Sequence, residues 1–266
     1  KKDVNMSIKT TINYSLNFNI KKRKKNDIKF LIYHYTGMKH EKASINRLLG
    51  IQSKVSAHYL IKNNGKIISM VPDLYSAWHA GISEWKKNKR INQKSIGIEI
   101  SNPGHQYGYV KFKKKQINSL IKISLYLIKK YNIKKSNILG HSDIAFERKK
   151  DPGEKFPWSY LANKKIGIWH KMKEKSLIKF RRKKISYIEM INFIKYLNKI
   201  GYFTKSLKNN KKIKLIKSFQ RRFRQKLING RIDKECLIIA EKLSKLSWEI
   251  NFSWKNLNNA YFELAR

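Results

Sequence analysis

Four short apolar segments, separated by turn-forming residues, limit the folds that this chain can adopt. They cover residues 29–36, 57–72, 95–101 and 137–141. Their β-branched and aromatic content predicts buried strands, and Asn-Asn-Gly inside the second segment predicts a β-hairpin. Residues 114–131 instead repeat apolar side chains at helical spacing. Strands combined with a long helix predict an α/β domain with a mixed central β-sheet flanked by helices.

Both ends of the chain differ from this pattern. The first ~27 residues contain the alternating run INYSLNFNI and predict an arm or an edge strand. After about residue 170 no strand pattern remains, and three helices are expected near 186–200, 210–227 and 233–247. A short helix over 41–49, closed by Gly50, is also expected. We therefore expect a small all-α C-terminal domain after the α/β domain.

The charge of the chain is high, with 61 Lys+Arg against 17 Asp+Glu and a formal net charge of +44. Of the basic residues, 50 are Lys and 11 are Arg. Base readout and bidentate phosphate contacts favour Arg, so we expect no specific nucleic-acid partner. We interpret the lysines as a solvated, compositional surface that attracts polyanions. A nucleic-acid-binding basic protein is the less favoured alternative.

Other features restrict the compartment and the covalent chemistry. The sole cysteine, Cys236, excludes an internal disulfide and a Cys-rich zinc site. No stretch of ~18 apolar residues is present, so no transmembrane segment is expected. The chain begins with Lys rather than Met. We expect the bacterial cell envelope (periplasm) if a leader was removed, and the cytoplasm otherwise.

Two histidines follow predicted strands and suggest a metal site. His34 ends the 29–36 strand, and His141 ends the 137–141 strand. Four acidic residues come soon after His141. These are Asp143, Glu147, Asp151 and Glu154. Two histidines and one carboxylate would give a three-ligand zinc site with an open position. Spacing alone leaves structural, hydrogen-bonded histidines as the alternative.

A series of motifs along the chain makes the assignment of the two histidines and the carboxylate more specific. They are HYT at 34–36, VSAHYLI at 55–61, AWHAGIS at 77–83, SIGIEISNPG at 95–104, GHSDIAFERKKDPG at 140–153 and FPW at 156–158. This run resembles the zinc-dependent N-acetylmuramoyl-L-alanine amidases of the AmpD/AmiD type, which share a fold with peptidoglycan recognition proteins. FPW, IGIW at 166–169 and the helical C-terminal part look closer to the AmiD type. The C-terminal motifs IGYF, SFQRRF and NGRID resemble a three-helix peptidoglycan-binding module.

The resemblance implies a division of the chain and an activity. The expected parts are an N-terminal arm (1–27), the amidase catalytic domain (28–170), a linker (171–184), a peptidoglycan-binding-like helical domain (185–250) and a C-terminal tail (251–266). The implied reaction is hydrolysis of the amide between N-acetylmuramic or anhydro-N-acetylmuramic acid and L-alanine, in peptidoglycan or muropeptides. A non-catalytic recognition module is the alternative. We expect one Zn²⁺ per chain and a monomer.

Residue by residue, the resemblance makes His34, His141 and Asp151 the zinc ligands. Asp143 is the competing ligand, with capping of the turn after His141 as its other role. Glu99 would be the general base, and its place inside the apolar run IGIEI suits a raised pKa. The alternative is a Glu on the solvated face of an edge strand.

Lys149 would stabilise the oxyanion, and only the motif register selects it over its neighbours Arg148 and Lys150. We expect the Lys150 side chain to point away from the cleft. For Arg148, a pairing with Glu147 or Glu154 is considered.

The aromatic residues Trp78 and His79 are expected to line the cleft and contact substrate. His58 is assigned to the same substrate-binding group, with a core position as the alternative. His40, His105 and His170 receive no role.

Overall fold

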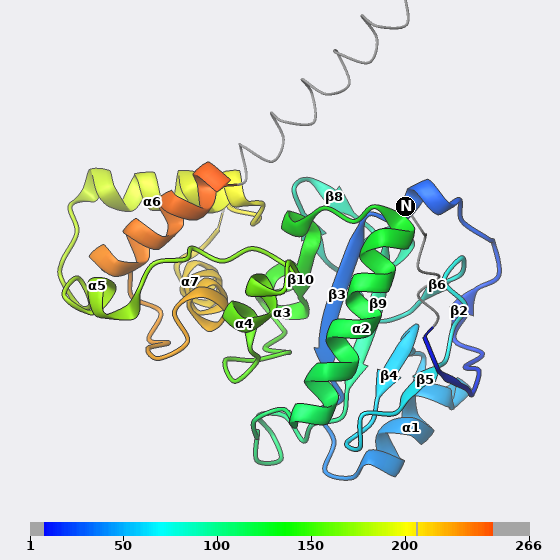
Figure 1. Cartoon of the computed structure of the whole chain (residues 1–266). Coiled ribbons are helices and arrows are strands. Elements are labelled where there is room, and N and C mark those ends of the chain that lie inside the picture. Colours follow the sequence, from blue (N-terminus) through cyan, green and yellow to red (C-terminus); the bar gives the residue numbers. More distant parts are fainter. Residues whose placement is uncertain (1–7, 206, 247–266) are drawn as a thin grey trace, which may run out of the picture. The chain divides into compact units, whose positions relative to one another are not determined.

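The computed structural model describes residues 8–205 and 207–246, and the chain forms two compact units, Lys1–Ile168 and Trp169–Arg266 (Figure 1). The strands of the first unit are β1 (Thr11–Ile12), β2 (Phe18–Asn19), β3 (Phe30–Tyr35), β4 (Tyr59–Ile61), β5 (Ile67–Ser69), β6 (Ser76–Ala77), β7 (Glu84–Trp85), β8 (Asn88–Lys89), β9 (Ser95–Ile100) and β10 (Ile138–Gly140). Its α-helices are α1 (Glu41–Leu49), α2 (Lys114–Tyr131), α3 (His141–Ile144) and α4 (Trp158–Asn163). Among the described residues, no helix combines the length and apolar character needed to cross a bilayer.

Six strands form the main sheet in the order β1-β5-β4-β9-β3-β10. The β4–β5 hairpin is antiparallel and the other pairs are parallel, which confirms the predicted mixed sheet. On one face, Tyr33 of β3 hydrogen-bonds to Ser124 of α2 through its hydroxyl (2.7 Å). From α1, Leu48 packs with Leu60 and Met70. Helices therefore flank a buried sheet, as the apolar segments predict.

The second unit is helical among its described residues. It contains α5 (Glu174–Ile178), α6 (Tyr187–Ile200), α7 (Asn209–Phe223) and a further helix over 234–246. Its core includes Phe193 of α6 packed edge-on against Phe219 of α7, with ring centroids 5.3 Å apart. This agrees with the three expected helices. The tail 251–266 lies outside the described residues.

The stretch 171–184, predicted to be a linker, is integrated into this second unit. It contains α5, whose Leu177 side chain is buried. Arg181 donates two hydrogen bonds to Glu235 at 2.7 and 2.8 Å, and the Arg182 amide donates to Asp233. Buried apolar contacts and ion pairs thus hold residues 171–184 against the rest of the second unit. The many lysines of this stretch had suggested a linker without such contacts.

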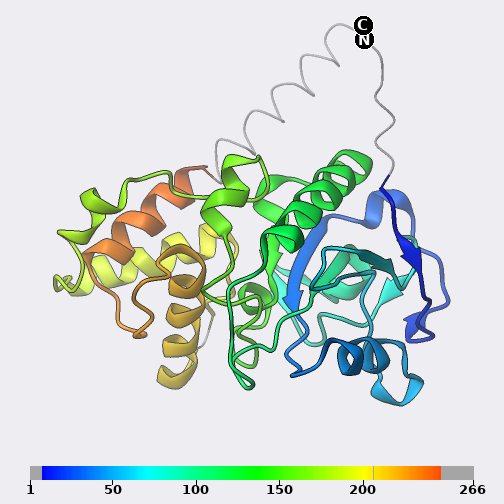
Figure 2. The same cartoon turned by 60° about the horizontal axis from the view of Figure 1, so that its bottom comes forward.

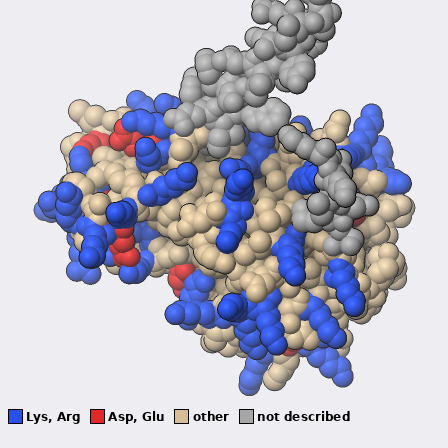
Figure 3. All heavy atoms as spheres, in the orientation of Figure 1, with Lys and Arg blue, Asp and Glu red and all other residues tan. Residues whose placement is uncertain are grey.

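Lysine and arginine side chains are spread widely over the face shown in Figure 3, and acidic side chains are few. The view shows basic residues along several elements rather than gathered into one band. This even distribution agrees with the interpretation that the lysines form a solvated surface over the whole protein rather than one binding site.

Candidate metal centre and active site

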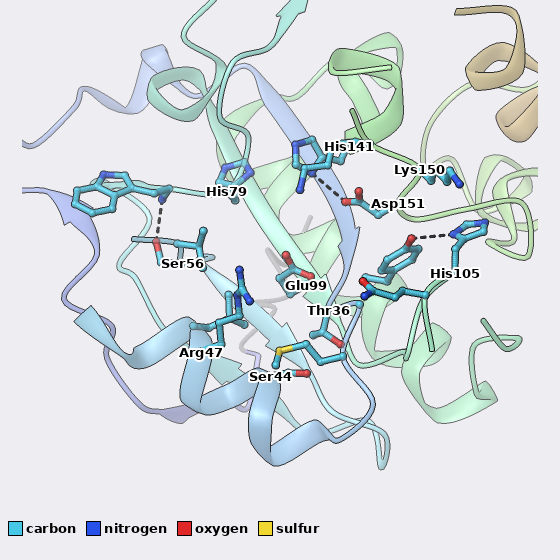
Figure 4. A pocket seen from close by; sticks show the side chains of 18 of the residues that line it. Thr36, Ser44, Arg47, Ser56, His79, Glu99, His105, His141, Lys150 and Asp151 are labelled. Carbon is cyan, nitrogen blue, oxygen red and sulfur yellow. Dashed lines mark hydrogen bonds and ion pairs between the residues drawn. The ribbon is translucent and has the colours of Figure 1, made fainter. Parts of the chain in front are cut away.

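Parallel pairing brings the two predicted histidine ligands together. β3 and β10 run side by side with Gly140 opposite Tyr33, so His141 follows β10 next to His34 at the end of β3. Asp151 comes from the loop after α3, and all three side chains are buried. His34 Nδ1 lies 2.9 Å from His141 Nδ1, and each nitrogen lies 3.0 Å from Asp151 Oδ2. Figure 4 shows His141 and Asp151 side by side. These three residues could hold a metal ion.

Hydrogen bonds behind the histidines determine which ring nitrogens carry protons. His141 Nε2 lies 3.0 Å from the Ala80 carbonyl oxygen, which can only accept. Ser95 Oγ donates to the Ile91 carbonyl (2.7 Å), so it accepts from His79 Nε2 (3.1 Å). His79 Nδ1 then accepts from His34 Nε2, 3.0 Å away. Both Nδ1 atoms at the centre are therefore left with lone pairs.

Three lone-pair donors that converge in this way suit a cation. Without a cation, two unprotonated nitrogens and a carboxylate oxygen face one another at about 3 Å with no proton between the nitrogens. A tetrahedral zinc ion with bonds of ~2.0–2.2 Å keeps its ligand atoms ~3.3 Å apart, close to the separations here. The donor set of two imidazoles and one carboxylate thus fits zinc with an open coordination position.

The electrostatic surroundings favour the metal-binding protonation states. Burial, and then the neighbouring His141, lower the pKa of His34 to about 4. Burial alone would raise the pKa of Asp151, but His141 and His34 outweigh it and hold that pKa below its usual range. Neutral imidazole and ionised carboxylate are the forms that bind metal ions.

A glycine on β9 makes room for the His79 side chain. A Cβ atom at Gly97 would lie 2.4 Å from His79 Cγ, closer than any side chain could accept. His79 in turn holds the ring of His34 through its Nδ1 atom. Gly97 in the SIGIE motif is therefore required by the packing behind the metal ligands.

Glu99 lies beside His34 because β3 and β9 are parallel and these two residues are opposite each other. Side chains at paired positions of neighbouring strands point to the same face. Its Oε2 atom is buried and has no hydrogen-bond partner in the described structure. Burial, with a contribution from the charge of Asp151, raises the pKa of Glu99 to about 8, although Lys149 opposes the shift. The Glu99 carboxyl thus gains and loses its proton close to neutral pH, as a group that exchanges protons during catalysis must.

Glu99, His141 and Asp151 line one cavity of about 590 Å³ (Figure 4). Its lining also includes Tyr35, Thr36, Gly37, Met38, Ser44, Arg47, Leu48, Val55, Ser56, Trp78, His79, His105, Gln106, Arg148, Lys149 and Lys150. Four cationic side chains surround the two carboxylates of Glu99 and Asp151. The cavity can therefore admit a substrate that itself carries negative charge.

The three basic residues before Asp151 occupy different positions. Lys149 is half-buried, and its charge acts on both Glu99 and His34. Lys150 is exposed and contributes to the cavity lining, while Figure 4 shows its side chain extending away from Glu99. Arg148 donates to the carbonyl oxygens of Ala80 and Ile82.

Two of the three predicted substrate contacts line the cavity. Trp78 lies at its wall, and its Nε1 atom donates to Asn19 (2.7 Å). His79 reaches the cavity but is largely buried behind His34. His58 is fully buried, with Nδ1 accepting from the Gly97 amide and Nε2 next to the Tyr75 carbonyl. The assignment of His58 to substrate binding is therefore wrong, because its ring is enclosed in the core.

Asp143 does not join the three donors. Its Oδ2 atom accepts from the Gly140 amide (2.8 Å) at the start of α3. This is the capping role considered for it as the alternative to metal binding, and Asp151 takes the position near both histidines.

Arg47 and His105 are among the cavity residues that sequence reasoning did not find. Arg47 projects from α1 into the cavity (Figure 4). His105 hydrogen-bonds to the Tyr35 hydroxyl (2.8 Å) and to Glu154 (3.0 Å). No local pattern marks either residue, because the contacts join segments far apart in the sequence. The only signal was the position of Tyr35 within the HYT motif.

Comparison with known proteins identifies the family. A family model described as N-acetylmuramoyl-L-alanine amidase matches residues 24–154. The amidase AmiD of Escherichia coli is 37% identical over 229 residues, which are 81% of this chain and 82% of AmiD. The chain belongs to the N-acetylmuramoyl-L-alanine amidase family. This confirms the resemblance and the predicted enzyme class, and members of this family generally depend on zinc.

Solved structures extend the similarity of this amidase to its fold. A complex of E. coli AmiD with the substrate anhydro-N-acetylmuramic acid-L-Ala-D-γ-Glu-L-Lys matches with a TM-score of 0.73 and 34% identity, over 85% of this chain and 91% of that one. AmpDh3 from Pseudomonas aeruginosa in complex with an anhydromuramic pentapeptide matches with a TM-score of 0.72 and 27% identity, over 92% of this chain and 98% of that one. Both matches extend beyond the catalytic domain of this amidase.

Proposed function

We propose that this amidase binds one Zn²⁺ per chain through His34, His141 and Asp151 and cleaves the amide between an N-acetylmuramic or anhydro-N-acetylmuramic residue and L-alanine. The observation that carries the proposal is the convergence of three lone-pair donors at about 3 Å beside the buried carboxyl of Glu99. Zinc, when bound, supplies Lewis acidity toward water and the scissile carbonyl.

Glu99 acts as the general base in this proposal. Its carboxyl lies next to His34 in the paired strands, so it faces the same space as the metal donors. The raised pKa allows the carboxylate to take the proton of the attacking water and later give it to the leaving amine. The absence of a partner on Oε2 leaves that atom available for this exchange.

Lys149 stabilises the negative charge that develops on the attacked carbonyl oxygen. Its ammonium group is close enough to Glu99 and His34 for its charge to lower the pKa of both. A fixed cation near the developing charge lowers the barrier because little reorganisation is needed during the reaction. Trp78 and His79 line the space that the sugar and peptide would occupy.

The proposed substrates are muropeptides, by analogy with the relatives crystallised with anhydromuramyl peptides. The cationic residues of the cavity suit the free carboxylates of a stem peptide. We propose that the helical second unit contributes peptidoglycan binding, and that the amidase acts as a monomer.

The test of this function is mass spectrometry of a purified muropeptide incubated with the protein. We expect a free stem peptide beginning with L-alanine and a sugar product that retains its lactyl group. Prior treatment with a chelator should abolish both products, and added zinc should restore them. Cleavage at another bond, or full activity after verified metal removal, would contradict the proposal.

The Lys149 assignment has its own prediction. Lys149→Ala should lower kcat by about 10²–10³-fold with zinc retained, the usual effect of removing one oxyanion donor. Lys150→Ala is the matched control and should stay within a few-fold of wild type, because its exposed ammonium is screened by solvent. Both variants are compared by kcat on one muropeptide and by metal content. Equal losses would mean that the two lysines are not distinguished as proposed.

A further inference from the structure

A row of large apolar side chains lies exposed near the N-terminus of the first unit. Ile12, Tyr14, Leu16 and Ile20 have exposed fractions of 65, 55, 69 and 87%. Figures 1 and 2 show this segment (dark blue) at the outer edge of the sheet, where β1 is the last strand. Isolated exposed apolar residues are ordinary, but several in succession along one segment indicate an interaction surface.

Hydrogen bonds hold this row outward. Ser15 Oγ donates to the Leu48 carbonyl (2.6 Å), and Asn17 Nδ2 donates to the carbonyls of Gly50 (2.9 Å) and Val55 (3.0 Å). Both polar side chains are buried. Because Ser15 and Asn17 are anchored inward on either side of Leu16, the Leu16 side chain is left facing solvent. The exposure of the row is therefore a property of the folded edge.

Exposed lysines follow the row directly. Lys21, Lys22, Lys24 and Lys25 are all exposed. Arg23 between them instead turns inward and donates to the carbonyls of Asp73 and Asn92. The nearest acidic residue in sequence, Asp27, caps the backbone amide of Lys24. Four exposed lysines thus follow four exposed apolar residues along the same edge segment.

We propose that this apolar-basic edge, formed by Ile12, Tyr14, Leu16, Ile20 and the four lysines, docks the protein on the surface of an anionic phospholipid bilayer. Apolar side chains next to lysines match the boundary between acyl chains and headgroups of such a bilayer. A second copy of this chain would bring two lysine clusters together and is disfavoured by charge. A glycan strand offers mainly hydroxyl groups, which do not match a row in which three of the four side chains are aliphatic.

The test is flotation of the full chain with phosphatidylcholine vesicles that contain phosphatidylglycerol or lack it. Binding is expected only to the vesicles with phosphatidylglycerol. Leu16→Ser/Ile20→Ser leaves the charge unchanged and should weaken binding at least about tenfold, because two inserted side chains are lost. The matched control is Ile178→Ser/Ile188→Ser in the second unit, where the exposed fractions are 54 and 70%. It should bind like wild type.

A second pair of variants tests the lysines. Lys21→Gln/Lys22→Gln should lose about fivefold per lysine at low salt, whereas Lys114→Gln/Lys122→Gln on α2 should lose clearly less. Trypsin cleavage after Lys21–Lys25 should also slow when anionic vesicles are present. The proposal would be overturned if the edge variants and their control variants lost the same amount of vesicle binding, or if Leu16→Ser/Ile20→Ser bound like wild type. Either result would mean that only the net charge of the protein attracts it to the vesicles.

Turnover of a soluble muropeptide separates this inference from the amidase function. None of the substituted residues lines the cavity, so each variant should keep the wild-type rate within about twofold and the wild-type Tm. A variant that binds vesicles poorly and is also unfolded would be replaced by the single substitution Leu16→Ser, with the same expected direction.

Discussion

Glu99→Gln is expected to lower kcat on a muropeptide by about 10²–10⁴-fold, the usual contribution of a positioned general base. Gln has nearly the same shape as Glu and can hydrogen-bond to water, but it cannot accept a proton. Initial rates and metal content should be measured on the same preparation, and one zinc per chain should remain. A rate within a few-fold of wild type would assign Glu99 a structural role.

Thermal unfolding of the chelated protein provides the control for that variant. The pKa of Glu99 is raised from 4.5 to about 8 by burial, so the folded state keeps its proton where the unfolded state has lost it. Its contribution to stability is complete below pH 4.5 and is lost as the pH rises through 8. Glu99→Gln should therefore raise Tm by roughly 10 °C at pH 8 and leave it unchanged at pH 4. A lower Tm at pH 8 would mean that the carboxylate is well solvated or paired in the fold.

His141→Ala should remove the bound metal and reduce turnover to background. Removing a direct ligand should weaken metal binding by more than the 10–100-fold typical of an outer-shell partner, because only His34 and Asp151 remain. Elemental analysis after dialysis measures the metal, and a muropeptide assay measures turnover. Unchanged metal content would contradict the ligand assignment.

Asp151 and Asp143 offer a matched pair for the same question. Asp151→Asn should lose metal, since a neutral amide replaces the one anionic donor near both histidines. Asp143→Asn should keep metal, because its amide oxygen can still accept from the Gly140 amide. The reverse result would make Asp143 the ligand.

Local patterns in the sequence were enough to predict most of the elements. The helix over 41–49 ends before Gly50, and the 114–131 helix matches α2. Each rests on periodicity within one segment, where backbone hydrogen bonds are short in sequence. The mixed sheet followed because strands around one long helix leave few arrangements.

Relations between segments were harder to predict. The pairing of His34 with Glu99 depends on the register of two strands about sixty residues apart, which no local pattern specifies. Only the family motifs supplied that information. Arg47 and His105 reach the cavity from segments without a motif, so their positions became visible only in the fold.

The N-terminal segment shows why alternation alone can mislead. INYSLNFNI has the period of a strand, and burial of its apolar residues would be the usual expectation. Here Ser15 and Asn17 form buried hydrogen bonds, and Leu16 faces solvent. Alternation predicts two faces, whereas the partners of the polar residues decide which face is buried.

The register between β3 and β9 also determines which kinds of mutation this protein and its descendants can tolerate. A substitution in either strand changes one side chain, but the insertion or deletion of a single residue moves every later side chain to the opposite face. Such a change in β9 would turn Glu99 away from His34 even if the sheet still formed. Gains and losses of residues are therefore expected to accumulate in the loops of descendants, while the lengths of these two strands stay constant for as long as hydrolysis is selected.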